Sequence, residues 1–117
     1  MQAAANAHDT DRFMSAFLRT SELVFAVNGE VIHGWDALRE QQRKWWNDGK
    51  SDAVYSEQGA SEFQRLDGRT VITTSRFRSK RSAADGSAKE GAFAVSYVWK
   101  KLPQGWTIVY GHESWAR

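Results

Sequence analysis

The fold is decided by residues 106–115, which read WTIVYGHESW. They follow the turn signal Pro103-Gln104-Gly105 and predict a β-strand. Side chains in a strand alternate between the two faces of its sheet. Strict alternation would give one face that changes from apolar to polar along the strand, made by Trp106, Ile108, Tyr110, His112 and Ser114. We interpret this face as the wall of a pocket.

The composition predicts one globular domain over residues 1–117. Hydrophobic residues make up 41% of the chain and charged residues 26%, which excludes a disordered chain. No apolar run approaches the roughly 20 residues of a membrane helix. The first residues lack the features of a signal peptide, and cysteine is absent, so we expect a cytoplasmic protein without a membrane partner. A net charge of +2 is too small to indicate nucleic acid binding.

The remaining patterns predict helices first and strands afterwards. Residues 9–18 have an apolar stripe at helical spacing behind the N-cap candidates Asp9 and Thr10. Residues 22–27 and 30–33 predict a hairpin around Asn28-Gly29, and a second helix follows from Gly34 to about residue 49. Residues 54–66 predict one long strand with a bulge at Gly59, and strands over 69–80, 89–102 and 106–115 follow it.

This order predicts an α+β fold. We expect the helices to pack in the concave face of a strongly curved, mostly antiparallel sheet, which leaves a cone-shaped barrel with one open mouth.

Three segments resemble the nuclear transport factor 2-like superfamily, also called SnoaL-like or cystatin-like cone folds. They are NGEVIHGW at 28–35, the strand at 71–77, and residues 105–114. The chain looks closest to stand-alone relatives of the association domain of calcium/calmodulin-dependent kinase two. The resemblance implies a homodimer formed through the convex sheet face. It also implies that Arg76 is a pocket arginine, while Tyr97 stands near the place of a second one.

Two groups of residues are candidates for the site. His112 and Ser114 would line the pocket, where His112 could bind a ligand or transfer a proton; a structural hydrogen bond is the alternative. Arg76 would bind an anion inside the cone or remain a surface arginine. The sequence predicts no cofactor and no metal site, since His8, His33 and His112 are far apart in the chain.

Aromatic residues form the second group. Tyr97 and Trp99 share a strand face and predict either an aromatic wall for a flat ligand or a dimer face. Tyr55 and Glu57 share another face, and a buried Glu57 could act as a base. Trp35 is a further ligand candidate, with core packing as the alternative.

Three functions fit these features. The first is the binding of a small organic acid or a flat apolar molecule. The second is cofactor-free isomerase, cyclase or hydratase chemistry of the ketosteroid-isomerase or SnoaL kind, with Glu57 as base and Tyr97 or His112 as donor. The third is an oligomerisation module. The enzyme hypothesis requires a carboxylate inside the cavity within reach of His112 or Tyr97.

Overall fold

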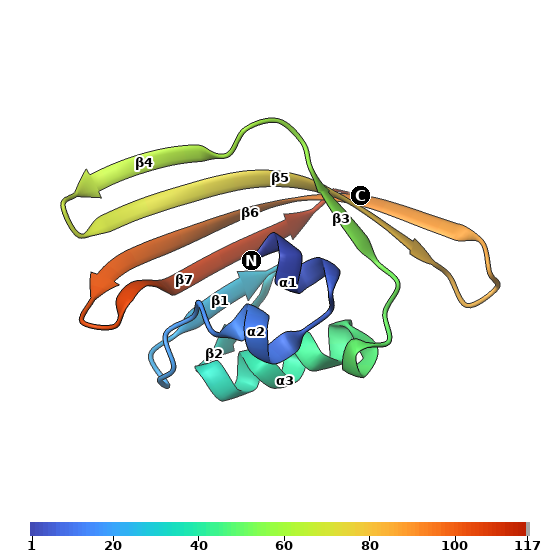
Figure 1. Ribbon diagram of the computed structural model, residues 1–117, viewed down its shortest axis with the longest axis horizontal. Coiled ribbons are helices and arrows are strands. Elements are labelled where there is room, and N and C mark those ends of the chain that lie inside the picture. The colour runs from blue at the N-terminus through green and yellow to red at the C-terminus, as the bar shows by residue number, and fades with distance from the viewer. Residues whose placement is uncertain (117) are drawn as a thin grey trace.

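A computed structural model describes residues 1–116 (Figure 1). Two short helices come first, and a hairpin, a longer helix and five strands follow. The helices are α1 (Gln2–Asn6), α2 (Thr10–Met14), α3 (Trp35–Trp45) and the 3-10 turn η1 (Asn47–Gly49). The strands are β1 (Val24–Val27), β2 (Glu30–His33), β3 (Val54–Glu57), β4 (Glu62–Asp67), β5 (Thr70–Ser82), β6 (Ala88–Leu102) and β7 (Gly105–Trp115).

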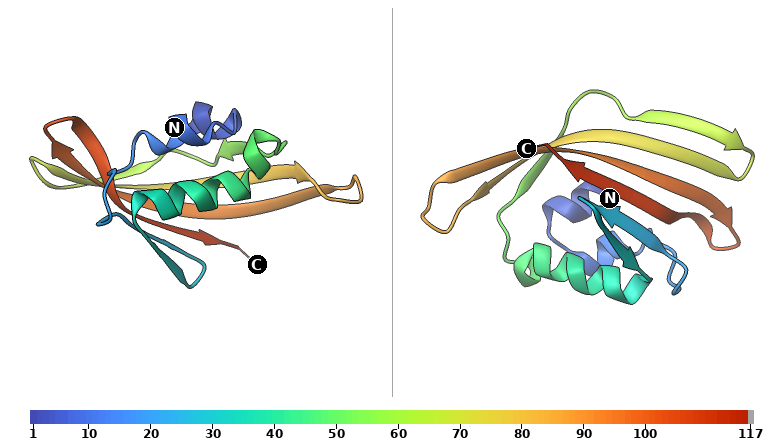
Figure 2. Two further views of the ribbon diagram at one scale, coloured as in Figure 1. Left: turned by 90° about the horizontal axis from the view of Figure 1, so that it is seen from below. Right: turned by 180° about the vertical axis from the view of Figure 1, so that it is seen from behind.

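All the strands belong to one curved sheet. Its order is β2-β1-β7-β6-β5-β3, and β4 pairs with β5 beyond the end of β3. Every pairing is antiparallel except that of β1 with β7. The helices lie on the concave side, and no described helix covers the convex side (Figures 1 and 2). The predicted α+β architecture is therefore confirmed.

Local sequence signals explain the first half of the chain. Asp9 caps α2, because its side chain accepts a hydrogen bond from the backbone N–H of Arg12 at 3.1 Å. Asn28 and Gly29 both have positive φ, as a two-residue hairpin turn with the twist of its strands requires. No helix in residues 1–116 is long and apolar enough to cross a bilayer.

The hydrophobic core lies between the helices and the β1–β7 half of the sheet. Met14, Leu23 and Ile108 are completely buried at its centre, and Leu38 of α3 is almost so. The segment after α2 is fastened to β7, since Leu18 N–H donates to Ile108 O at 2.8 Å and Ile108 N–H donates to Ala16 O at 2.9 Å. This attachment holds the helices over only one part of the concave face.

The prediction of one continuous strand over residues 54–66 is wrong. The chain forms β3 and β4 as separate strands, both antiparallel to β5. Between them, Gly59 has φ +79°, and Gln58 N–H donates to Arg76 O at 2.8 Å. A left-handed glycine turns the backbone out of the extended conformation, so the strand breaks here rather than bulging.

The bulge lies in β7 instead. Trp99 pairs with Ile108, whereas Val98 pairs with Tyr110, so Val109 is an extra residue. An extra residue reverses the alternation of the side chains that follow it. The predicted common face is therefore wrong beyond Ile108. Ile108 enters the core, and Tyr110, His112 and Ser114 lie on the convex face.

Candidate functional site

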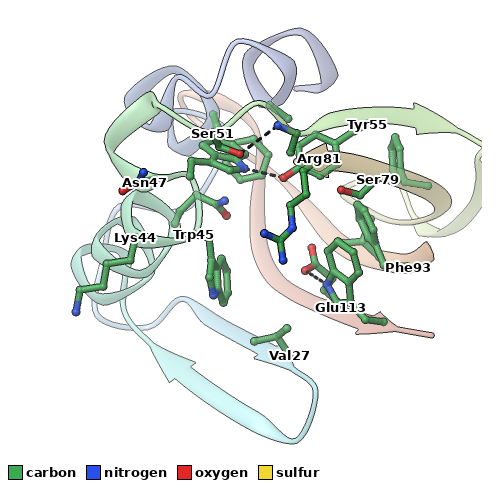
Figure 3. Close-up of a pocket in the computed structure, with 18 of the residues that line it drawn as sticks. Val27, Lys44, Trp45, Asn47, Ser51, Tyr55, Ser79, Arg81, Phe93 and Glu113 are labelled. Carbon is green, nitrogen blue, oxygen red and sulfur yellow. Dashed lines mark hydrogen bonds between the residues drawn. The ribbon is translucent and has the colours of Figure 1, made fainter. Parts of the chain in front are cut away.

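A cavity of about 1020 Å³ opens between the concave face of the sheet and the helices (Figure 3). Its walls come from α1, the end of α3, β1, β3 and the long strands β5 to β7. This size matches pockets that enclose small organic molecules, which span about 300–1,000 Å³. The part of the concave face that the core leaves uncovered is therefore a candidate binding site.

Stacked aromatic rings form the floor of this cavity. Trp115 of β7 stacks on Phe93 of β6, with centroids 4.4 Å apart and planes at 27°. Phe93 in turn stacks on Phe77 of β5 at 5.4 Å and 19°. A Cβ atom at Gly91 would lie only 2.9 Å from Trp115 Cζ3, so glycine at this position makes room for the indole. The floor is a continuous row of rings across three strands.

Glu113 is the acidic group beside this floor. The bulge at Val109 directs its side chain to the concave face, in one row with Val95 and Val27. Trp115 Nε1 donates a hydrogen bond to Glu113 Oε2 at 2.8 Å. Burial raises the pKa of the Glu113 carboxyl above its ordinary value, and the hydrogen bond from Trp115 opposes this shift in part. The carboxyl therefore lies in the cavity with one oxygen held in place.

Two tyrosine hydroxyls share the cavity with Glu113. Burial, together with the nearby charge of Glu113, raises the pKa of Tyr97, which keeps its hydroxyl protonated. We find no hydrogen bond to this hydroxyl among residues 1–116. Tyr55 accepts a hydrogen bond from Trp46 Nε1 at 2.8 Å, which leaves its own proton free to donate. Burial likewise raises the pKa of Tyr55. Both hydroxyls can donate to a bound ligand.

The structure places the other candidates of the last strand outside the cavity. His112 pairs with Ser96, and Ser114 and Arg76 both pair with Ala94, on the convex face. All three candidate side chains are exposed, and none lines the cavity. The prediction that His112 and Ser114 line the pocket is corrected, because strict alternation ignored the extra residue in β7. For Arg76, the pocket role implied by the resemblance is corrected, and the structure agrees with the alternative of a surface arginine.

The remaining candidates have structural surroundings. Trp99 is on the concave face, but it packs against the core, and its Nε1 donates to Thr73 Oγ1 at 3.0 Å. Trp35 is buried, and its Nε1 donates to Met14 O at 3.0 Å. Glu57 is exposed and accepts a hydrogen bond from Ser61 Oγ. Of the predicted residues, only Tyr55 and Tyr97 lie in the cavity lining.

The sequence interpretation did not include Glu113 and Trp115 among the candidate site residues. The signal that could have revealed them is Gly111, because a glycine inside a strand often marks a bulge or a close approach. A Cβ at Gly111 would lie 2.7 Å from Phe25 Cδ2 and 3.1 Å from Tyr97 Cδ1. Gly111 thus lies on the crowded concave face, two residues before Glu113.

A curved sheet around helices with an open cavity defines the cone class of α+β domains. A comparison of the sequence with known families leads to the same class. The chain belongs to the SnoaL-like domain family, whose match covers residues 1–117. No curated protein matches the chain significantly.

Three solved structures share this fold. An NTF-2-like protein of unknown function from Shewanella oneidensis is 23% identical, with 97% of this chain and 88% of that chain covered and a TM-score of 0.79. A candidate calcium/calmodulin-dependent protein kinase II association domain from Xanthomonas campestris is 13% identical, with coverages of 97% and 78% and a TM-score of 0.76. A ketosteroid isomerase-like protein from Erwinia carotovora is 17% identical, with coverages of 98% and 87% and a TM-score of 0.77.

The raised pKa of Glu113 predicts a pH-dependent stability. The folded state holds this proton more tightly than the unfolded state does, so the free energy of unfolding falls as pH rises from 4.5 through the folded pKa. Relative to Glu113→Gln, the wild type should lose stability over this interval, as measured by urea unfolding followed by tryptophan fluorescence. Glu62→Gln, which alters an exposed glutamate of the same sheet, is the control. If the difference in the free energy of unfolding between the wild type and Glu113→Gln were the same at every pH, this placement of the carboxyl would be contradicted.

Proposed function

We propose that the protein binds a small planar organic molecule in its cone cavity. The observation that carries this proposal is the stacked row of Trp115, Phe93 and Phe77 beside three groups that can hydrogen-bond a ligand. Rings prefer offset-stacked or edge-on partners, and an aromatic pair adds about 0.5–1.5 kcal/mol beyond burial. A flat molecule on this floor has its polar edge near Glu113, Tyr97 and Tyr55.

Binding of 2-naphthol tests this function. Isothermal titration should show saturable binding to the wild type, and Phe93→Ala should weaken it about threefold to tenfold, because an aromatic stacking partner is lost. Glu62→Gln, at an exposed position of the outer strand β4, should leave the affinity unchanged. Absence of saturable binding, or equal affinity of the wild type and Phe93→Ala, would refute the proposal.

Glu113 favours a second function, which is cofactor-free proton transfer next to a carbonyl group. A carboxylate with a raised pKa is a suitable base near neutral pH. The Tyr97 hydroxyl could donate a hydrogen bond to the oxygen that becomes negative as the carbon loses its proton. The fold shared with a ketosteroid isomerase-like protein is compatible with this chemistry but does not establish it. Glu113 replaces Glu57 as the candidate base, and Tyr97 remains as the candidate donor in place of His112.

Hydrogen exchange tests the second function. In D₂O, the wild type should accelerate deuteration of 2-tetralone at the carbon beside its carbonyl, followed by proton NMR. Glu113→Gln should reduce the rate about a hundredfold or more, as expected for loss of a general base. His112→Gln, on the convex face, should keep the wild-type rate. Equal rates for the wild type and Glu113→Gln would exclude Glu113 as the base.

We also propose that two copies pair through the convex face of the sheet. The register places Ile72, Val98 and Tyr110 in one row there, beside the small residues Ala94 and Ser96. A row of apolar groups that no described helix covers suits a sheet-to-sheet contact (Figure 2). The third function of the sequence analysis, assembly alone, gains no support from this face, because the cavity on the other side is open.

Sedimentation tests the pairing. The wild type should sediment as a dimer, and Ser96→Arg should shift it to a monomer, because a charged side chain would be buried at the centre of the contact. Glu62→Arg, at the outer strand, should remain dimeric. A monomeric wild type at micromolar concentration would contradict the proposal.

A further inference from the structure

The side chains of the cavity floor change from acidic to aromatic to basic along the strands. Glu113 stands in the row of Val95. One step further along the sheet comes the aromatic row of Phe77, Phe93 and Trp115. Two steps beyond that row, toward the β5–β6 turn, Arg81 pairs with Lys89. Adjacent rows on one face are two residues, or about 7 Å, apart. The backbone positions of an acid and a cation therefore lie on opposite sides of an aromatic platform.

Arg81 points back into the cavity rather than away from it. Figure 3 shows its guanidinium directed toward Glu113, on the side of the cavity that holds Tyr55 and Ser79. The ion pairs found in residues 1–116 involve Arg39 and Arg43, and none involves Arg81. Its planar group of donors is thus available to a ligand.

Other charges at the mouth do not neutralise Arg81. Lys44 and Lys50 also line the cavity, with Glu30 and Asp52 as the outer acids. The Asp52 carboxylate accepts a hydrogen bond from Ser82 N–H at 3.0 Å. The pKa of Asp52 is lowered mainly by its hydrogen bonds with Ser82, and the charge of Arg81 contributes least to that shift. Asp52 is therefore engaged by the backbone beside Arg81 and does not pair with the guanidinium.

We propose that Arg81 selects ligands that carry a carboxylate at one end and a hydroxyl or carbonyl group at the other. The carboxylate pairs with the guanidinium, the flat body lies on Phe77, Phe93 and Trp115, and the far polar group meets Glu113 and Tyr97. A second negative charge at the far end is disfavoured by the Glu113 carboxyl. This inference rests on the proposed binding function and adds the class of ligand to it.

A matched pair of probes tests this selectivity. The probes are 6-hydroxy-2-naphthoate and its uncharged amide, 6-hydroxy-2-naphthamide, which share ring and hydroxyl and differ in charge. Isothermal titration of the wild type should show the carboxylate bound about tenfold more tightly than the amide, because a charge-assisted hydrogen bond is stronger than a neutral one. Arg81→Gln should weaken the binding of the carboxylate about tenfold and leave the affinity for the amide nearly unchanged.

Arg78→Gln is the control, because Arg78 belongs to the same strand but pairs with Ser56 and Ala92 on the convex face. It removes the same charge and should leave both affinities at their wild-type values. Equal binding of the two probes, or equal effects of Arg81→Gln and Arg78→Gln, would overturn the role of Arg81 while the binding function stands. If neither these probes nor 2-naphthol binds, the binding function fails, and the inference fails with it.

Discussion

The β-bulge at Val109 is the constraint on which the rest of the structure depends. One extra residue in β7 changes which face each later side chain occupies. Before the bulge, Ile108 enters the core and receives the segment that follows α2. After it, Glu113 and Trp115 enter the cavity, while His112 and Ser114 turn to the convex face. The core and the candidate site are thus built from the same strand by a single local irregularity.

Two glycines make this arrangement sterically possible. Gly111 leaves space for the Phe25 and Tyr97 rings, and Gly91 leaves space for the Trp115 indole. With the indole in that space, its N–H reaches the Glu113 carboxyl. A buried carboxyl without any partner would be costly, so this hydrogen bond helps to keep an acid beside an apolar floor. In the function that we propose, the same floor favours flat molecules, and Arg81 supplies the end that binds an anion.

Much of the fold could be predicted from local signals. Asn28-Gly29 predicted the hairpin, and Asp9 predicted the start of α2. The run of strands after Ser51 predicted the α+β class. The resemblance to cone folds agrees with the family match. The site was harder to predict, because the face of each side chain depends on register. Residues 58–61 and Val109 each interrupt the regular pattern that strand prediction assumes.

Tyr55 and Tyr97 were found because their strands are regular at those positions, whereas Glu113 was not among the candidate site residues because it follows the bulge. Arg76 was assigned by analogy and lies on the convex face, whereas Arg81, further along the same strand, lines the cavity.

A crystal structure of the unliganded protein would test the central claim most directly. The expected result is an extra residue at Val109, with the Glu113 carboxyl in the cavity, hydrogen-bonded to Trp115 Nε1, and with His112 on the opposite face. A regular β7 that places His112 inside the cavity and Glu113 on the convex face would contradict it.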